Sequence, residues 1–278
     1  MSALEIARLM NRQDELVPRA IRRALPGVAK AIDLIAGQLS KGGRLLYVGT
    51  GTSGRIGALD AVEIPPTFGT SHGMAQFVIA GGTRALGRAT EASEDSAALG
   101  RRDMARKKPK KDDVVVGIAA SGRTPYTIGA LEHAAAKGAA TIAVVCNRGS
   151  KLARQAQVAI EVEVGPEVLT GSTRLKAGSA EKMICNMLST GAMARLGYVY
   201  GNLMVNLRPK NKKLYERGRS IVEHVAGVSR KTAERTLRSA GEVPLALVML
   251  KAGIGRAEAS RRLKGTRGIV RRALRDAP

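Results

Sequence analysis

Aromatic residues, cysteine and histidine are scarce in this chain of 278 residues. It has no Trp, five Tyr and two Phe, which argues against a nucleic-acid site that stacks bases on aromatic rings. Its two cysteines, Cys146 and Cys185, are too few for a disulfide framework or a four-thiolate zinc site. The three histidines, His72, His133 and His224, are not spaced as a helical metal pair, which argues against a zinc hydrolase.

Long apolar runs are also lacking. No stretch approaches the roughly 20 apolar residues that span a bilayer, so we expect no membrane insertion. The first residues carry Glu5 and Arg8 and contain no long apolar segment, so they do not look like a secretion signal. We therefore expect a cytoplasmic protein. Hydrophobic residues still make up 44% of the chain, which is enough for a packed core.

Acidic residues are few relative to basic ones. The chain has 46 Lys and Arg against 23 Asp and Glu, a net charge of +23. Two runs are densely basic, 101–111 and 251–278, but neither contains an aromatic residue or a recognised nucleic-acid-binding motif. Neutralisation of nucleic-acid phosphates is therefore the weaker interpretation. Attraction of a small anionic substrate is a simpler use of the same charge.

Short apolar strands alternate with helical segments through most of the chain. This alternation predicts a parallel sheet wrapped by helices, an α/β/α sandwich. Helical spacing is expected over 3–40, with breaks at Pro18 and Pro26, and again from Leu175 onward. From about Val228 the pattern predicts three or four short, basic helices. The predicted strands lie at 44–48, 74–80, 114–118, 141–145 and 158–164.

Two loops rich in Ser, Gly and Thr follow predicted strands, at 49–55 and 119–124. Ligands bind parallel sheets at the carboxyl ends of the strands. Small residues there bring backbone amides close to an anion, and the following helix adds its positive end. Neither loop matches the dinucleotide or nucleoside triphosphate fingerprint, which favours a small phosphorylated molecule. The candidate binding residues are Gly51, Thr52, Ser53, Ser121, Gly122 and Thr124.

Two glutamates are predicted to lie in opposed environments. Glu63 precedes a Pro-Pro pair, which predicts the carboxyl end of a short helix over 56–62, where the helix dipole disfavours a carboxylate and a proton donor fits. Glu94 follows residues that cap helices, so it lies in a first turn, which suits a base. Opposed carboxylates form an acid/base pattern, although Glu91 and Asp95 remain alternatives to Glu94.

A third segment, 170–178, places a Ser/Thr cluster before a helix that carries Arg and Lys in its first turns. Ser172 and Lys176 are therefore candidates for contact with an anion. Ordinary helix capping with solvated charges explains the same pattern.

Together these segments resemble the N-acetylmuramic acid 6-phosphate etherase family of the sugar isomerase (SIS) superfamily. The resemblance covers nearly the whole chain and is densest at 44–55, 59–69, 118–126, 169–178 and 200–205. It implies an SIS-type α/β domain over 41–226, preceded by a helical segment over 1–40. A small all-helical (UBA-like) subdomain follows over 227–278.

The resemblance also implies an activity. The substrate is N-acetylmuramic acid 6-phosphate, a phosphorylated amino sugar from peptidoglycan recycling. Its D-lactyl ether is cleaved by elimination and water addition, giving N-acetylglucosamine 6-phosphate and D-lactate. No metal or organic cofactor is implied. The family forms homodimers with the site near the subunit interface.

The resemblance assigns roles to individual residues. Glu63 matches the acid that protonates departing lactate, and Glu94 matches the base at carbon 2. The loop hydroxyls match positions that hold sugar phosphate. The sequence departs from the family pattern where Ser and Cys are usual beside the acid, and where Thr and Gln are usual on a later helix. The residues at those four positions are Val62, Ile64, Ser179 and Glu181.

Two other functions fit part of this pattern. One is a non-catalytic sugar-phosphate sensor, of the kind that regulates glucokinase, and the other is a sugar-phosphate isomerase. Glu63 and Glu94 favour the enzyme over the sensor, because a sensor needs only the phosphate loops. The Pro-Pro signature argues against the isomerase.

Overall fold

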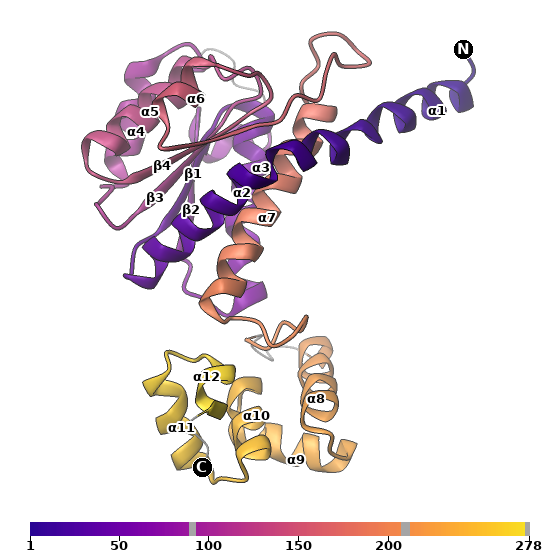
Figure 1. Cartoon of the computed structure of the whole chain (residues 1–278), viewed down its shortest axis with the longest axis vertical. Coiled ribbons are helices and arrows are strands. Elements are labelled where there is room, and N and C mark those ends of the chain that lie inside the picture. Colours follow the sequence, from indigo (N-terminus) through magenta and orange to yellow (C-terminus); the bar gives the residue numbers. More distant parts are fainter. Residues whose placement is uncertain (89–92, 207–211, 276–278) are drawn as a thin grey trace. The chain divides into compact units, whose positions relative to one another are not determined.

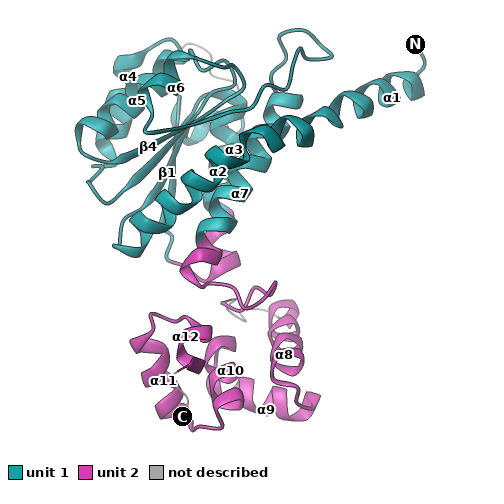
Figure 2. Cartoon of the chain, viewed as in Figure 1, with its two compact units in different colours: residues 1–62, 71–192 teal, residues 63–70, 193–278 magenta. Residues whose placement is uncertain are grey.

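The computed structural model describes residues 1–88, 93–206 and 212–275. The chain divides into two compact units (Figure 2). The first consists of residues 1–62 and 71–192, and the second of residues 63–70 and 193–278. The domain boundaries expected from the sequence, near residues 40 and 226, stay predictions.

A five-stranded parallel sheet lies at the centre of the first unit (Figure 1). The strand order is β2-β1-β3-β4-β5, and every neighbouring pair is parallel. The predicted parallel α/β fold is therefore confirmed. Four predicted strands agree within a residue at each end, while β5 ends three residues early. The strands are β1 (Leu45–Gly49), β2 (Ala75–Ile79), β3 (Val114–Ile118), β4 (Ala140–Val145) and β5 (Val158–Glu161).

Helices cover both faces of this sheet (Figure 1). Because successive side chains of a strand point to opposite faces, β1 contacts both layers. Leu46 and Val48 pack in the layer of α4 (Ala97–Arg106), α5 (Pro125–Ala136) and α6 (Lys151–Gln155). The Tyr47 hydroxyl points the other way and donates to Asp60 of α3 at 2.7 Å. The helices on that side are α2 (Leu16–Ser40), α3 (Gly51–Phe68) and α7 (Lys176–Leu196).

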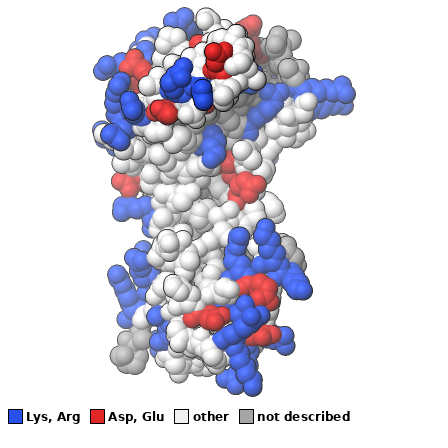
Figure 3. Space-filling model, turned by 90° about the vertical axis from the view of Figure 1, so that its right-hand side faces the viewer, with Lys and Arg blue, Asp and Glu red and all other residues white. Residues whose placement is uncertain are grey.

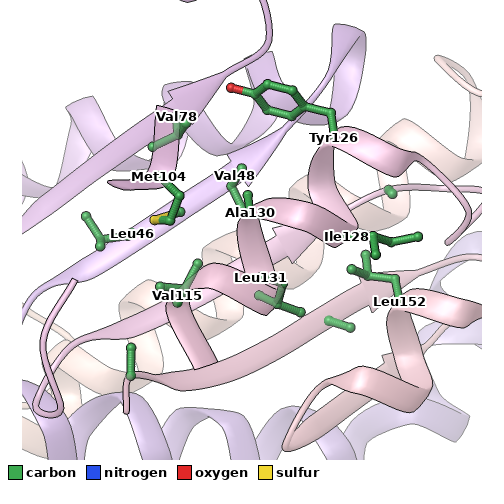
Figure 4. Packing of buried hydrophobic residues seen from close by; sticks show 14 of the residues in the cluster. Leu46, Val48, Val78, Met104, Val115, Tyr126, Ile128, Ala130, Leu131 and Leu152 are labelled. Atoms are coloured by element: carbon green, nitrogen blue, oxygen red, sulfur yellow. The ribbon is translucent and has the colours of Figure 1, made fainter. Parts of the chain in front are cut away.

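The buried cluster under α4 and α5 is built from β-branched and aliphatic residues, as a fully covered parallel sheet requires. Figure 4 shows Met104 of α4 and Leu131 of α5 packed toward Val115 of β3. All three side chains are buried. This packing fixes the ends of the central strands, from which the candidate loops depart.

Prolines interrupt the helices less than the sequence predicts. α3 continues to Phe68 with Pro65 and Pro66 inside it, so the helix expected over 56–62 is longer at both ends. Each proline removes one backbone donor, yet the Gly69 N–H donates to the Pro65 carbonyl at 2.9 Å and completes the final turn. Glu63 is thus inside the helix, and the prediction that it ends the helix was wrong.

The same correction applies to the amino-terminal helices. α2 continues through Pro26, so the break predicted there was wrong. Pro18 lies in the first turn of α2, where a missing N–H leaves no intrahelical bond unmade. The helical region is divided just before it, between α1 (Ala3–Asp14) and α2. A short 3-10 helix, η1 (Gly82–Leu86), follows β2.

The second unit is helical apart from its connections. Its helices have a core of their own that includes Val222, Leu237, Leu247 and Leu263. The prediction of short helices after Val228 is confirmed. Within the described ranges, every helix is too short or too polar to traverse a lipid bilayer. The helices are α8 (Lys212–Ala226), α9 (Arg230–Ala240), α10 (Val243–Ala252), α11 (Arg256–Gly265) and α12 (Val270–Arg275).

Candidate active site

The two candidate loops leave the same edge of the sheet. β1 and β3 are neighbours, and Gly49 at the end of β1 is in register with Ile118 at the end of β3. A Cβ on Gly49 would lie 2.9 Å from the Gly54 nitrogen and 3.0 Å from the Ile118 oxygen. Glycine is therefore required where the loops approach each other. The prediction that both loops meet at the carboxyl edge is confirmed.

The first loop passes directly into α3. Gly51 has φ +49 and begins the helix, and Thr52 beside it is half-buried. The Thr52 methyl group is 3.4 Å from the point where a Cβ on Gly178 would lie, so this loop adjoins the start of α7. Ser53 is buried, and its hydroxyl donates to Glu181 of α7 at 2.9 Å.

The second loop is tightly folded. The Ser121 hydroxyl oxygen accepts from the Arg123 N–H at 3.2 Å. Gly122 has φ +62, and a Cβ there would collide with the Ser150 side chain. Ser121 stays half-buried rather than enclosed. Its hydroxyl hydrogen is not used in this hydrogen bond, because the hydroxyl oxygen is the acceptor.

Glu94 lies against the second loop. The Thr124 hydroxyl donates to Glu94 Oε1 at 3.3 Å, and the Tyr126 N–H donates to the Glu94 carbonyl at 3.0 Å. Main chain and side chain of Glu94 are thus both attached to the start of α5. Of the alternative bases, Asp95 is exposed and Glu91 is outside the described residues. Two residues singled out for different reasons, Glu94 and Thr124, are therefore in contact.

The third segment has internal partners. The Lys176 side chain is buried, and its ammonium donates to Gln13 of α1 at 2.8 Å. The N–H groups of Lys176 and Ala177 each donate to the Glu167 carboxylate at 3.0 Å. Ser172 is half-buried in the turn before α7, where its N–H donates to the Leu169 carbonyl at 3.0 Å. Substrate contact by Ser172 and Lys176 stays a prediction.

Glu63 is exposed on α3 and belongs to the second compact unit. Of its two neighbours, Val62 is exposed and Ile64 is buried. Glu94 belongs to the first unit. The pairing of the two glutamates stays a prediction.

Relatives of known identity cover almost all of this chain. N-acetylmuramic acid 6-phosphate etherase from Serratia proteamaculans (strain 568) is 52% identical over 275 residues, which span 99% of this chain and 93% of the relative. The chain belongs to the N-acetylmuramic acid 6-phosphate etherase family. The etherase from Yersinia pestis (strain Pestoides F) matches with the same identity and coverage.

Three domain families match parts of this etherase-family chain, and the first two matches overlap. Residues 27–135 match the N-terminal SIS domain of glucokinase regulatory protein, and residues 90–190 match the SIS domain. Residues 201–242 match the C-terminal lid domain of glucokinase regulatory protein. These matches agree with an SIS-type sheet followed by a helical region.

Solved structures confirm the SIS fold of this family member. Phosphoheptose isomerase from Neisseria gonorrhoeae superposes with TM-score 0.51 at 18% identity, covering 68% of this chain and 97% of that one. A putative sugar-phosphate isomerase from Listeria monocytogenes gives TM-score 0.51 at 17% identity, covering 72% and 94%. At such identities the likeness concerns the fold.

One titratable residue beside the first loop was not predicted from the sequence as part of the site. Glu181 is 1% exposed, and burial raises its pKa to about 8, although the hydrogen bond from Ser53 acts in the opposite direction. A sequence signal was available, because Ile184, Cys185 and Leu188 form the buried face of α7 at helical spacing with Glu181. A carboxyl group on such a face needs a partner.

Asp60 is a second buried carboxyl group behind the first loop. It accepts hydrogen bonds from Tyr47, from Asn186 at 2.8 Å and from Ser189 at 3.1 Å. Burial raises the pKa of Asp60, and these three hydrogen bonds and the charge of Lys182 offset part of that rise. The network connects β1, α3 and α7 and thereby supports the helix that carries the first loop.

The surface of this etherase-family chain is strongly basic. Lys and Arg side chains lie on both units on the face drawn in Figure 3, where they outnumber the Asp and Glu side chains. With a net charge of +23, the field around the molecule favours the approach of anions.

Proposed function

We propose that this chain cleaves the D-lactyl ether of N-acetylmuramic acid 6-phosphate and releases N-acetylglucosamine 6-phosphate and D-lactate. The observation that carries the proposal is 52% identity to named etherases along 99% of the chain. The contact between Glu94 and the second loop supports it. The reaction breaks a carbon–oxygen bond by elimination, which makes the enzyme a lyase.

Glu94 is the proposed base. In the open-chain sugar, the proton at carbon 2 is acidified by the neighbouring aldehyde. Glu94 removes that proton, and the electron pair forms a double bond between carbons 2 and 3 while the bond from carbon 3 to the lactyl oxygen breaks. The hydrogen bond from Thr124 fixes one carboxylate oxygen and so orients the base relative to the loop that we propose holds the phosphate.

Glu63 is the proposed acid. It protonates the lactyl oxygen as that oxygen leaves carbon 3, so lactate departs without an unstable charge. Water then adds to carbon 3, and a proton returns to carbon 2. The net change is hydrolysis of the ether with no oxidation.

The loop residues are the proposed phosphate cradle. Hydroxyls of Thr52, Ser53 and Ser121 lie at the carboxyl ends of β1 and β3, where α3 and α5 begin. The Thr124 hydroxyl donates its one hydrogen to Glu94, so Thr124 holds the base beside this cradle. Backbone amides at helix starts and neighbouring hydroxyls form a common anion site. The sugar phosphate binds there, and the rest of the sugar extends toward Glu94.

A homodimer is also proposed. Leu59 and Val62 of α3 are more than half exposed, and an apolar groove of about 630 Å³ lies between α2 and α7, bordered by Leu25 and Met183. Apolar surface of this kind is typical of faces that a second subunit covers. Sedimentation equilibrium at micromolar protein tests this, and a monomer at every concentration would reject it. The cytoplasmic location expected from the sequence stays a prediction.

The enzyme is tested with N-acetylmuramic acid 6-phosphate in heavy water, followed by a D-lactate assay and mass spectrometry. We expect lactate, and product with one deuterium at carbon 2. Phosphosugar binding without lactate would instead favour the sensor, for which the glucokinase regulatory protein profiles are the supporting observation. The Glu63→Ala variant should release no lactate but still exchange the carbon 2 proton. Full cleavage by that variant would reject the acid role.

A further inference from the structure

The buried carboxyl group of Glu181 is the most unusual polar group near the first loop. Its Oε1 accepts the hydrogen bond from Ser53 at 2.9 Å. Its Oε2 is buried and has no hydrogen-bond partner among the described residues. An ionised carboxylate in this position would leave one charged oxygen without a donor, which is costly in a dry interior. The neutral acid avoids the charge, because a proton on Oε1 can be donated to Ser53 and Oε2 is then an uncharged carbonyl oxygen.

We propose that Glu181, in its protonated form, is a positioning residue that donates a hydrogen bond to Ser53 and so turns the Ser53 hydroxyl toward the phosphoryl group of the substrate. The proposal rests on the proposed phosphosugar site. It adds a proton-dependent residue behind that site.

The protonation state of Glu181 determines what the Ser53 hydroxyl can offer a phosphate. Ser53 has one hydrogen to donate. When Glu181 is ionised it can only accept hydrogen bonds. Ser53 then donates its hydrogen to Glu181 and presents only an oxygen lone pair to the phosphate. When Glu181 is protonated it donates to the Ser53 oxygen, and the Ser53 hydrogen is free for a phosphate oxygen. The proton on Glu181 therefore converts Ser53 from a repelling contact into an attracting one.

The surroundings of Glu181 favour the proton. The facing titratable groups are two thiols, Cys146 after β4 and Cys185 on α7. Burial raises the pKa of the Cys146 thiol most, and the charge of Glu181 raises it further. Burial also raises the pKa of Cys185, followed by the charges of Asp60 and Glu181. Glu167 adds a further negative charge near Cys146. No cation in the described part of the chain contributes to the pKa of Glu181. A bound phosphate dianion adds negative potential and favours protonation further.

The test measures binding of N-acetylglucosamine 6-phosphate by calorimetry from pH 7 to pH 9, where the phosphate stays a dianion. We expect wild-type affinity to fall about tenfold across this range, as one charge-assisted hydrogen bond is lost. Binding near pH 8 should take up a fraction of a proton, measured from the heat in buffers with different ionisation enthalpies.

Two variants and a control separate the proposal from a structural role. Glu181→Gln supplies an uncharged donor of the same size, so its affinity should change little with pH and its binding should take up no proton. Ser53→Ala should bind about as weakly at pH 7 as wild type does at pH 9. The surface variant Glu132→Gln, whose carboxylate pairs with Arg101, should behave as wild type.

The outcomes distinguish this inference from the proposed function. Absence of phosphosugar binding at every pH overturns both. Binding whose pH dependence and proton uptake are the same in wild type and Glu181→Gln overturns the role of Glu181 alone. Proton uptake is measured on the wild type, so the inference can be tested even if Glu181→Gln does not fold. Wild-type binding near pH 8 without proton uptake would overturn it.

Discussion

Buried carboxyl groups at the two ends of the central strands, the amino edge and the carboxyl edge of the sheet, differ in how fully they are hydrogen-bonded. At the amino edge, Asp113 is 2% exposed and accepts from the Arg44 guanidinium at 2.6 Å and from the N–H groups of Arg44 and Lys110 at 2.9 Å each. At the carboxyl edge, Glu181 is equally buried, but within the described ranges it has one donor, Ser53, and no cation that shifts its pKa.

The pKa values follow this difference. Burial alone would raise the pKa of Asp113, but the hydrogen bonds from Arg44 and Lys110 and the Arg44 charge lower it overall. Burial raises the pKa of Glu181 to about 8. Asp60 lies between these cases, with three neutral donors and a raised pKa. The fully paired carboxylate thus lies at the amino edge, which we call the scaffold edge, and the incompletely paired one lies at the carboxyl edge, where the two candidate loops begin.

The largest expected effect is on catalysis at the carboxyl edge. Glu94→Gln keeps the size of the side chain and an acceptor for Thr124 but removes the base. We expect kcat for lactate release to fall by about 10² to 10⁴, with exchange of the carbon 2 proton lost and stability unchanged. Lactate assay and deuterium incorporation measure both effects. The matched control is Asp95→Asn, the exposed neighbour, and a comparable loss in that variant would move the base away from Glu94.

The scaffold edge should respond in the opposite way. Asp113→Ala leaves the Arg44 guanidinium and two backbone N–H groups without their acceptor. We expect the free energy of unfolding to fall by about 3 kcal/mol, with kcat of the folded protein close to wild type. Urea unfolding measures the first quantity and steady-state kinetics the second. Asp112→Ala removes the adjacent carboxylate as a control, and an equal loss there would show that the Arg44 pair carries no special stability.

Local sequence signals were enough to predict the strands of the sheet and the two loops at its carboxyl edge. Runs such as Val114–Ile118 read as buried strands because each residue is apolar, and the structure places a strand over those five residues. The Ser, Gly and Thr loops were predicted because turn chemistry is local. The helical first turn expected for Glu94 was wrong, because α4 begins at Ala97 and Ser96 caps it. The contact between Glu94 and Thr124 is a tertiary one that the fold makes.

Tertiary contacts account for what the sequence missed. The Pro-Pro pair was expected to end α3, but the helix continues to Phe68, since packing outweighs two lost backbone bonds. The hydrogen bond from the Lys176 ammonium to Gln13 joins residues 163 positions apart and could not be predicted, while substrate contact by Lys176 stays a prediction. Glu181 was noticed only as a departure from the family pattern, because its partner Ser53 is 128 positions away.

A stability measurement tests whether Glu181 is protonated in the folded chain. Its pKa is about 8 when folded and about 4.3 when unfolded. The stabilisation is complete below the unfolded value and is lost as pH rises toward 8, because only the unfolded chain then releases the proton. Between pH 6 and pH 8 we expect wild type to lose roughly 2 kcal/mol more than Glu181→Gln. Urea unfolding at both pH values measures this.

The control for that experiment is Glu132→Gln, a surface carboxylate, which should keep the wild-type pH dependence. The raised pKa of Asp60 contributes equally to wild type and variant, so it cancels in the difference. Parallel curves for wild type and Glu181→Gln would mean that Glu181 is ionised in the fold and that the two sheet edges do not differ in this way.

The smallest expected effect concerns the exposed part of the carboxyl edge. Ser121 is half-buried, and its hydroxyl oxygen accepts only one backbone hydrogen bond in the described contacts, from Arg123. Ser121→Ala should therefore cost little stability but weaken phosphosugar binding about fivefold, the effect of about 1 kcal/mol for one neutral hydrogen bond. We expect KM to rise by that factor with kcat nearly constant, because the phosphate is bound equally in the ground and transition states. Ser239→Ala, on an exposed position of α9, is the matched control. An unchanged KM in Ser121→Ala would remove the second loop from the phosphate cradle and leave Glu94 and Thr124 as its only link to the reaction.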